Sequence, residues 1–301
     1  MNYVVETFDL TKQYAGHRAV DQVSLSVPEG CVYGFIGPNG AGKSTTMKML
    51  LGLLKPSGGT IQLLGRQMNG QNRLQLLRRT GSLIESPSCY GHLTGEENLQ
   101  IVADLKNVPK KDIDRVLEIV DLTSSRRRKV KQYSLGMRQR LGIAQALLGE
   151  PRLLILDEPT NGLDPAGIQE MRTLISQMPQ RCGATVLISS HLLSEIEQIV
   201  DQVGIINHGR LLFQGPLTEL QQHSRGDISL RVLHPGKALP ILEQLGPVSQ
   251  KEHTFTLPAM PDEQLSTLVQ QLALSRAGVV ELKHRTRSLE EIFLSLTGEG
   301  S

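Results

Sequence analysis

The chain has 301 residues, of which 39% are hydrophobic and 21% charged, a composition typical of folded globular proteins rather than of disordered chains. Its formal net charge of +2 lacks the basic excess of proteins that neutralise many phosphates, so nucleic acid is not an expected partner. The cysteines Cys31, Cys89 and Cys182 are odd in number and widely spaced, which argues against disulfides or a zinc site and favours a reducing cytoplasm.

The length exceeds that of a usual domain of about 100–200 residues, so we expect one large domain with a smaller appendage. The N-terminus lacks a basic leader followed by an apolar stretch. No later run approaches the roughly 18 apolar residues needed to cross a bilayer. We therefore expect any association with a membrane to be peripheral.

Three short apolar runs, each ending in polar residues, predict buried strands of a parallel sheet. They span residues 31–36, 153–156 and 185–188. Helical patterns lie between them, and one of these runs from Met47 to Leu54. The alternation predicts an α/β fold with a mostly parallel sheet. Ligands bind at the carboxyl ends of such strands, where Gly37, Asp157 and His191 would meet.

Residues 37–44 match the phosphate-binding pattern GxxxxGK[ST] between a predicted strand and a predicted helix. They are Gly37, Pro38, Asn39, Gly40, Ala41, Gly42, Lys43 and Ser44. The glycines allow backbone N–H groups to surround a phosphate at the helix N-terminus, where Lys43 would reach the β- and γ-phosphates. The hydroxyl of Ser44 would ligate Mg²⁺. The alternative, a glycine-rich turn capped by Ser44, explains fewer of the specified positions.

Two adjacent carboxylates, Asp157 and Glu158, follow the second predicted strand. Adjacent carboxylates usually mark an exposed turn, but a buried strand precedes these two, and Pro159 follows them. We expect Asp157 to hold a magnesium ion through water and Glu158 to polarise an attacking water. Together with the phosphate-binding loop, this pair also fits a kinase, a GTPase or a strand-exchange ATPase.

A third motif places Ser134 and Gly136 at the start of a predicted helix. The N-terminus of a helix offers unpaired N–H groups and a partial positive charge to a phosphate. Ser134 could equally be a simple helix cap. The position of the motif shortly before the strand that ends at Asp157 favours the phosphate-binding interpretation.

These motifs together resemble those of the nucleotide-binding subunits of ABC transporters, and the resemblance covers residues 1–223. It implies the phosphate-loop ATPase fold with an added helical subdomain. It also implies a head-to-tail dimer with two ATP molecules at its interface. The second subunit would be another copy of this chain or a paralogous ATPase.

The resemblance also assigns roles to individual residues. Lys43, Glu158 and His191 correspond to catalytic residues of the family. Asp157 and Ser44 correspond to residues on the side of the site where the metal binds. Tyr14 matches the aromatic residue that stacks on adenine. The remaining residues implied to contact ATP are Thr45 in the phosphate loop, Ser134 and Gly136 in the signature segment, and Asp164 in the loop after Glu158. A lone tyrosine or histidine would otherwise be unremarkable.

Two departures from the family pattern are informative. The usual signature is LSGGQ, whereas Leu135 here replaces the first glycine. Glu85 stands where most members carry a glutamine that contacts the metal, and its carboxylate would add negative charge beside the γ-phosphate. Both departures resemble the branch that exports bacitracin and lantibiotic-type peptides.

The resemblance therefore implies an ATP- and Mg²⁺-dependent ATPase that powers export by a separate integral membrane permease. Its place would be the cytoplasmic face of the membrane, and its cargo antimicrobial peptides, drugs or similar amphipathic compounds. The alternative is a soluble ABC-type ATPase of translation or DNA repair, which would carry a long heptad-bearing insertion or a second cassette. A GTPase or small-molecule kinase would leave the signature segment unexplained.

The chain after residue 223 carries no recognisable motif, and we place a domain boundary there, with domains at 1–223 and 224–301. Its elements alternate, which predicts a small α+β appendage. The predicted elements are strand 228–233, helix 238–245, a strand pair within 248–257, helix 263–274, strand 279–283 and helix 289–296.

A basic run at 126–131 precedes the signature segment. We favour a solvated loop for this run. The alternative is a source of positive potential near a phosphate of the second subunit or near anionic headgroups.

Overall fold

The structure is a computed structural model and describes residues 2–222, 225–245, 248–258 and 260–286. It divides into two compact units, Met1–Leu217 and Thr218–Ser301, which are described separately below. The sequence placed this division after residue 223. The helix predicted at 289–296 lies outside the described residues.

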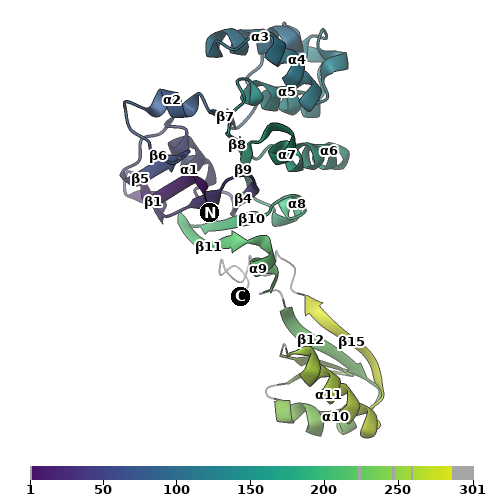
Figure 1. Ribbon diagram of the computed structural model, residues 1–301. Helices are drawn as coiled ribbons and strands as arrows, with labels where there is room; N and C mark the ends of the chain where they lie inside the picture. The colour runs from purple at the N-terminus through teal and green to yellow at the C-terminus, as the bar shows by residue number, and fades with distance from the viewer. Residues whose placement is uncertain (1, 223–224, 246–247, 259, 287–301) are drawn as a thin grey trace. The chain divides into compact units, whose positions relative to one another are not determined.

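The first unit is built on a six-stranded sheet with the strand order β11-β10-β4-β9-β8-β7 (Figure 1). All neighbouring strands are parallel except β10 and β11. The strands are β4 (Val32–Ile36), β7 (Thr80–Leu83), β8 (Leu153–Asp157), β9 (Thr185–Ser190), β10 (Gln202–Asn207) and β11 (Arg210–Pro216). Strands β4, β8 and β9 are buried along their whole length, as continuous apolar runs in parallel sheets are. The three predicted strands and the α/β class are confirmed.

A second, antiparallel sheet has the order β2-β1-β5-β6, with β3 paired to β1. Its strands are β1 (Tyr3–Tyr14), β2 (His17–Val23), β3 (Ser26–Pro28), β5 (Gly58–Leu63) and β6 (Arg66–Gln67). Helix α1 (Lys43–Leu50) shares one hydrophobic core with this sheet and with β4, to which Leu10, Met47 and Phe35 contribute. The predicted helix ended at Leu54, but α1 ends at Leu50.

Helices α3, α4 and α5 pack together as a helical subdomain at the top of Figure 1. They span Gly95–Lys106, Lys111–Ile119 and Leu135–Leu147. The remaining helices of this unit are α2 (Arg73–Leu77), α6 (Pro165–Ser176), α7 (Met178–Cys182) and α8 (Leu193–Ile196), with 3-10 turns η1 (Thr123–Ser125) and η2 (Val130–Gln132). None of the helices in the described part of the chain combines the length and apolarity that a membrane span requires.

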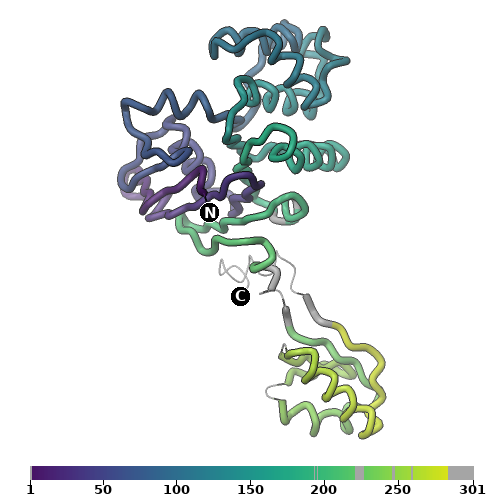
Figure 2. Tube along the Cα trace, in the orientation of Figure 1, coloured from purple at the N-terminus to yellow at the C-terminus, as the bar shows by residue number. Residues whose placement is uncertain are grey.

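The second unit begins with α9 (Leu217–Gln222), and the elements after this helix have the order β-α-β-β-α-β. Its elements are β12 (Arg225–Val232), α10 (Pro235–Leu242), η3 (Glu243–Leu245), β13 (Ser249–Lys251), β14 (Thr254–Leu257), α11 (Asp262–Leu274) and β15 (Val279–Thr286). The sheet order β13-β14-β12-β15, with every neighbouring pair antiparallel, is that of ferredoxin-like domains. Figure 2 traces this chain path from green to yellow. The topology by itself assigns no function to the unit.

Candidate active site

The phosphate-binding loop, residues 37–42, connects the buried strand β4 to helix α1. Lys43 begins this helix, and its buried ammonium donates hydrogen bonds to the carbonyl oxygens of Gly37, at 2.7 Å, and Pro38, at 3.2 Å. Burial lowers the pKa of Lys43, while two nearby carboxylates act in the opposite direction. The cation is therefore held at the mouth of the loop by backbone oxygens.

The two sides of this loop differ in their surroundings. A β-carbon added to Gly37 would overlap the carbonyl oxygen of Ile206 on β10. A β-carbon added to Gly40, at φ +83°, would meet nothing within 4 Å. Asn39 and Gly40 are exposed. The loop thus packs against the sheet on one side and is open on the other.

Glu158 links the predicted catalytic residues. Its Oε1 lies 3.5 Å from Nζ of Lys43, and its Oε2 lies 3.2 Å from Nδ1 of His191. Asp157 Oδ1 accepts a 2.6 Å hydrogen bond from the hydroxyl of Ser189, which accepts a 2.9 Å hydrogen bond from the Glu158 N–H. The carboxyl ends of β4, β8 and β9 therefore bring Lys43, Asp157, Glu158 and His191 together.

The oxygen donors at this edge of the sheet suit a hard divalent cation. Within the described residues, the hydroxyl of Ser44 and Oδ2 of Asp157 have no hydrogen-bond partner. No cluster of three or more His, Cys, Asp or Glu side chains that could hold a metal occurs in the described ranges. A magnesium ion generally takes one or two protein ligands and fills its shell with waters and substrate phosphates, so these donors fit such an ion.

Glu85 follows β7, whose Leu83 pairs with Leu156 of β8. It therefore lies at the same carboxyl edge as Asp157. Its Oε1 lies 2.7 Å from Nζ of Lys48, a residue of α1. This hydrogen bond raises the pKa of Lys48 and lowers that of Glu85. The Glu85 carboxylate is thus engaged with a lysine.

Tyr14 is the last residue of β1, and its ring is 46% exposed. The ammonium of Lys12 lies 5.1 Å from the ring centroid, within range of a cation–π contact. The exposed ring is available for stacking.

The loop between Glu85 and α3 is fixed by one buried side chain. The Asn98 amide donates to the carbonyl oxygens of Tyr90 and Thr94, at 3.1 and 2.8 Å, and accepts a 2.8 Å hydrogen bond from the Tyr90 N–H. Asn98 is only 1% exposed. The loop is therefore attached to the first turn of α3.

Replacing Asn98 by Ala should lower the free energy of unfolding by about 2 kcal/mol, because the part-buried N–H of Tyr90 loses its partner and the carbonyl oxygens of Tyr90 and Thr94 keep only their backbone donors. Urea denaturation measures this change. Gln100→Ala on the same helix is a matched control, since its amide bonds only Asp104 at an exposed position. An equal loss in both variants would contradict this role of Asn98.

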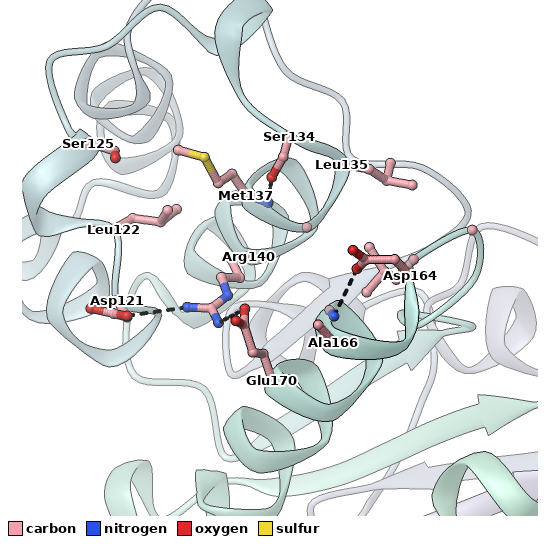
Figure 3. A pocket seen from close by; sticks show the side chains of 14 residues that line it. Asp121, Leu122, Ser125, Ser134, Leu135, Met137, Arg140, Asp164, Ala166 and Glu170 are labelled. Atoms are coloured by element: carbon pink, nitrogen blue, oxygen red, sulfur yellow. Dashed lines mark hydrogen bonds and ion pairs between the residues drawn. The ribbon is translucent and has the colours of Figure 1, made fainter.

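The signature residues line a separate hollow of about 630 Å³ between α5 and α6 (Figure 3). Ser134 caps α5 by accepting a hydrogen bond from the Met137 N–H, and Asp164 caps α6 by accepting one from the Gly167 N–H. Gly136 also lines the hollow. The predicted helix start at Ser134 is confirmed.

Arg140 lines this hollow and lies between Asp121 and Glu170 (Figure 3). It donates to Glu170 at 2.7 Å and to the carbonyl oxygen of Val120 at 3.2 Å, and lies 3.6 Å from Asp121. Within the described residues, no hydrogen bond or ion pair joins the caps of α5 and α6 to the lysine and carboxylates of the phosphate-loop side. Within one chain, these residues therefore form two separate clusters.

The basic run divides into two kinds of side chain. Arg126 is paired with Glu96 at 2.7 Å and Asp114 at 2.7 Å. The others, Arg127, Arg128, Lys129 and Lys131, are exposed, and none forms an ion pair within the described ranges. Backbone hydrogen bonds join the run to residues 91–96. Most of the run is a solvated surface, as expected, but Arg126 is part of the fold.

Sequence reasoning missed Ser189 and Lys48. Ser189 is polar at the carboxyl end of a predicted strand, a position that could have drawn attention to it. Lys48 lies inside a helix in which lysine is common, and no local signal connects it to Glu85, which is 37 residues away. Its contact is visible only in three dimensions.

Comparisons with known proteins relate the chain to one family. The family model described as "ABC transporter" matches residues 20–161. A bacitracin transport ATP-binding protein of Bacillus licheniformis is 49% identical over 81% of this chain and 80% of its own length. A lantibiotic transport ATP-binding protein of Streptococcus pyogenes is 45% identical over 68% of this chain and 88% of its own length. The solved structure of cbiO1 from Clostridium perfringens, part of an ABC transporter complex, has a TM-score of 0.69 at 28% identity, covering 73% of this chain and 91% of that one.

Proposed function

This chain belongs to the ATP-binding subunits of ABC transporters, ATPases that couple hydrolysis to transport, and we propose that it powers export of amphipathic antimicrobial peptides by a membrane permease on another chain. The observation that carries the ATPase part is the meeting of Lys43, Asp157, Glu158 and His191 at one sheet edge. The relatives named for bacitracin and lantibiotic transport support the cargo.

ATP lies with its phosphates in the loop formed by Gly37 to Thr45, and its adenine stacks on the exposed ring of Tyr14. Lys43 exchanges its bonds to loop carbonyls for contacts with the β- and γ-phosphates. Ser44 and Asp157 would hold Mg²⁺, with Glu85 nearby, and the ion would neutralise charge on the phosphates.

Hydrolysis is assisted by Glu158. Its carboxylate orients a water molecule and accepts its proton as the water oxygen attacks the γ-phosphorus, and the bond to the ADP oxygen breaks. The Nδ1–H of His191 donates a hydrogen bond to Oε2 of Glu158 and keeps this carboxylate in position. The hydroxyl of Ser189 holds the backbone of Glu158 beside Asp157.

The hollow lined by Ser134, Gly136 and Asp164 serves the other subunit. The N-terminus of α5 presents unpaired N–H groups to the γ-phosphate held by a second copy or a paralogous ATPase. Leu135, which stands beside them, is 37% exposed and leaves this approach open. ATP binding thereby closes the dimer and hydrolysis reopens it. The loop after Glu85 passes this movement to the permease at the cytoplasmic face of a bacterial membrane.

The first test is purification of the tagged chain from native membranes with ATP present, followed by mass spectrometry. We expect a polytopic membrane protein in stoichiometric amount, with an untagged strain as the control. Recovery of ribosomes or DNA instead would support the soluble ATPase of translation or repair, which the relatives do not favour.

The cargo is tested in cells that lack the gene. Their resistance to bacitracin or to lantibiotics should fall, and the wild-type chain, but not the Glu158→Gln chain, should restore it. Unchanged resistance with an intact permease complex would contradict the peptide cargo and leave the transporter assignment standing.

A further inference from the structure

The carboxylate at Glu85 creates an electrostatic difficulty in the proposed site. Asp157 and Glu158 already lie at the carboxyl edge of the sheet, and Glu85 adds a third negative charge there. ATP brings further negative charge to this edge. Like charges at one site repel one another, and a cation placed between them reduces this repulsion.

Lys48 lies where it can offset that charge. Its ammonium lies 2.7 Å from Oε1 of Glu85, a distance typical of a charge-assisted hydrogen bond. Lys48 lies on α1, five residues after Lys43. Lys43 is next to Glu158, so helix α1 supplies one lysine to each of these two carboxylates.

The backbone conformation of Glu85 is unusual and needs contacts that stabilise it. Glu85 has φ +62°, in the left-handed region that residues other than glycine rarely adopt. Such a conformation persists when surrounding contacts stabilise it. The bond to Lys48 is such a contact.

We propose that Lys48 is a positioning residue that holds the Glu85 carboxylate at the edge of the nucleotide site and screens its charge from the γ-phosphate. The inference rests on the proposed ATP site. The pairing gives the Glu85 carboxylate a neighbouring cation, which reduces its repulsion of the γ-phosphate.

The test is equilibrium binding of ATP and of ADP in EDTA, which removes both metal and turnover from the measurement. Lys48→Met should weaken ATP binding about fivefold, the upper end for an exposed ion pair, because Glu85 then repels the γ-phosphate. ADP lacks this phosphate, so its binding should change less than about twofold. Lys48→Arg keeps the charge and should stay within about twofold of the wild type.

Two further variants distinguish the positioning of Glu85 from a general effect of removing a positive charge. Lys55→Met removes an exposed charge a few residues beyond α1 and should change ATP binding less than about 1.5-fold, because Lys55 forms no ion pair within the described residues. In a Glu85→Gln background, adding Lys48→Met should also have an effect below about 1.5-fold, because the repelling charge is gone.

Equal effects of Lys48→Met and Lys55→Met would overturn the inference, as would a fivefold loss that persists in the Glu85→Gln background. Failure of the proposed function gives a different result. The wild-type chain would then bind no ATP, and the role of Lys48 would fall with it.

Discussion

Glu158→Gln should lower the rate of ATP turnover at least about 100-fold and leave ATP binding intact. Glutamine has nearly the same shape as glutamate, and its amide still reaches His191, but it cannot accept the proton of the attacking water. ATP should therefore accumulate in a closed dimer. Phosphate release measures the turnover, and gel filtration with ATP measures the dimer.

Glu29→Gln is the matched control for this variant, because Glu29 is a surface carboxylate paired with Arg152. Its turnover should stay within about twofold of the wild type. A Glu158→Gln chain that hydrolyses ATP at the normal rate would remove Glu158 from the role of general base.

Mixing two inactive variants should restore ATP hydrolysis. Lys43→Met disables the phosphate-loop half-site, and Gly136→Asp places a negative charge where the γ-phosphate approaches α5. A mixed dimer contains one composite site with both halves intact. With random pairing and independent sites, the mixture should reach about a quarter of the wild-type rate, while each variant alone stays near zero.

Gly136→Asp is suited to this test because the fold accommodates it. A β-carbon at Gly136 meets only the side chain of Leu163, at 3.8 Å. An acidic side chain in the first turn also stabilises a helix, so the variant should unfold no earlier than the wild type. The double variant Lys43→Met/Gly136→Asp mixed with Lys43→Met is the negative control. Full activity of Gly136→Asp alone, or no recovery on mixing, would contradict the composite site.

The elements that surround the site were predictable from sequence because they are buried on both faces. Strands β4, β8 and β9 appear as continuous apolar runs, so their ends at Ile36, Asp157 and Ser190 mark the functional edge. Strand β1 was missed because its register shifts interrupt the alternation of buried and exposed residues. Gly52, at φ +62° just after α1, explains why the helix stops before Leu54.

The site residues that could be predicted from the sequence are those that lie in short sequence motifs. Lys43, Asp157 and Glu158 lie in local motifs, and the fold brings them together. Ser189 and Lys48 act through partners on other segments, so their contacts depend on the packing of β9 against β8 and of α1 near β7. In the second unit, alternation predicted the strands and helices, but not the strand order.

Gly37 and Gly40 are glycines for two different reasons, as their surroundings show. Gly37 is glycine because the neighbouring strand leaves no room for a side chain, a condition that applies whether or not a nucleotide is present. Gly40 has free space and is glycine for its backbone angle. Gly37 thus serves the packing of the fold, whereas Gly40 shapes the surface that ATP meets. A side chain at Gly37 should therefore act first on stability, and one at Gly40 on the binding of the nucleotide.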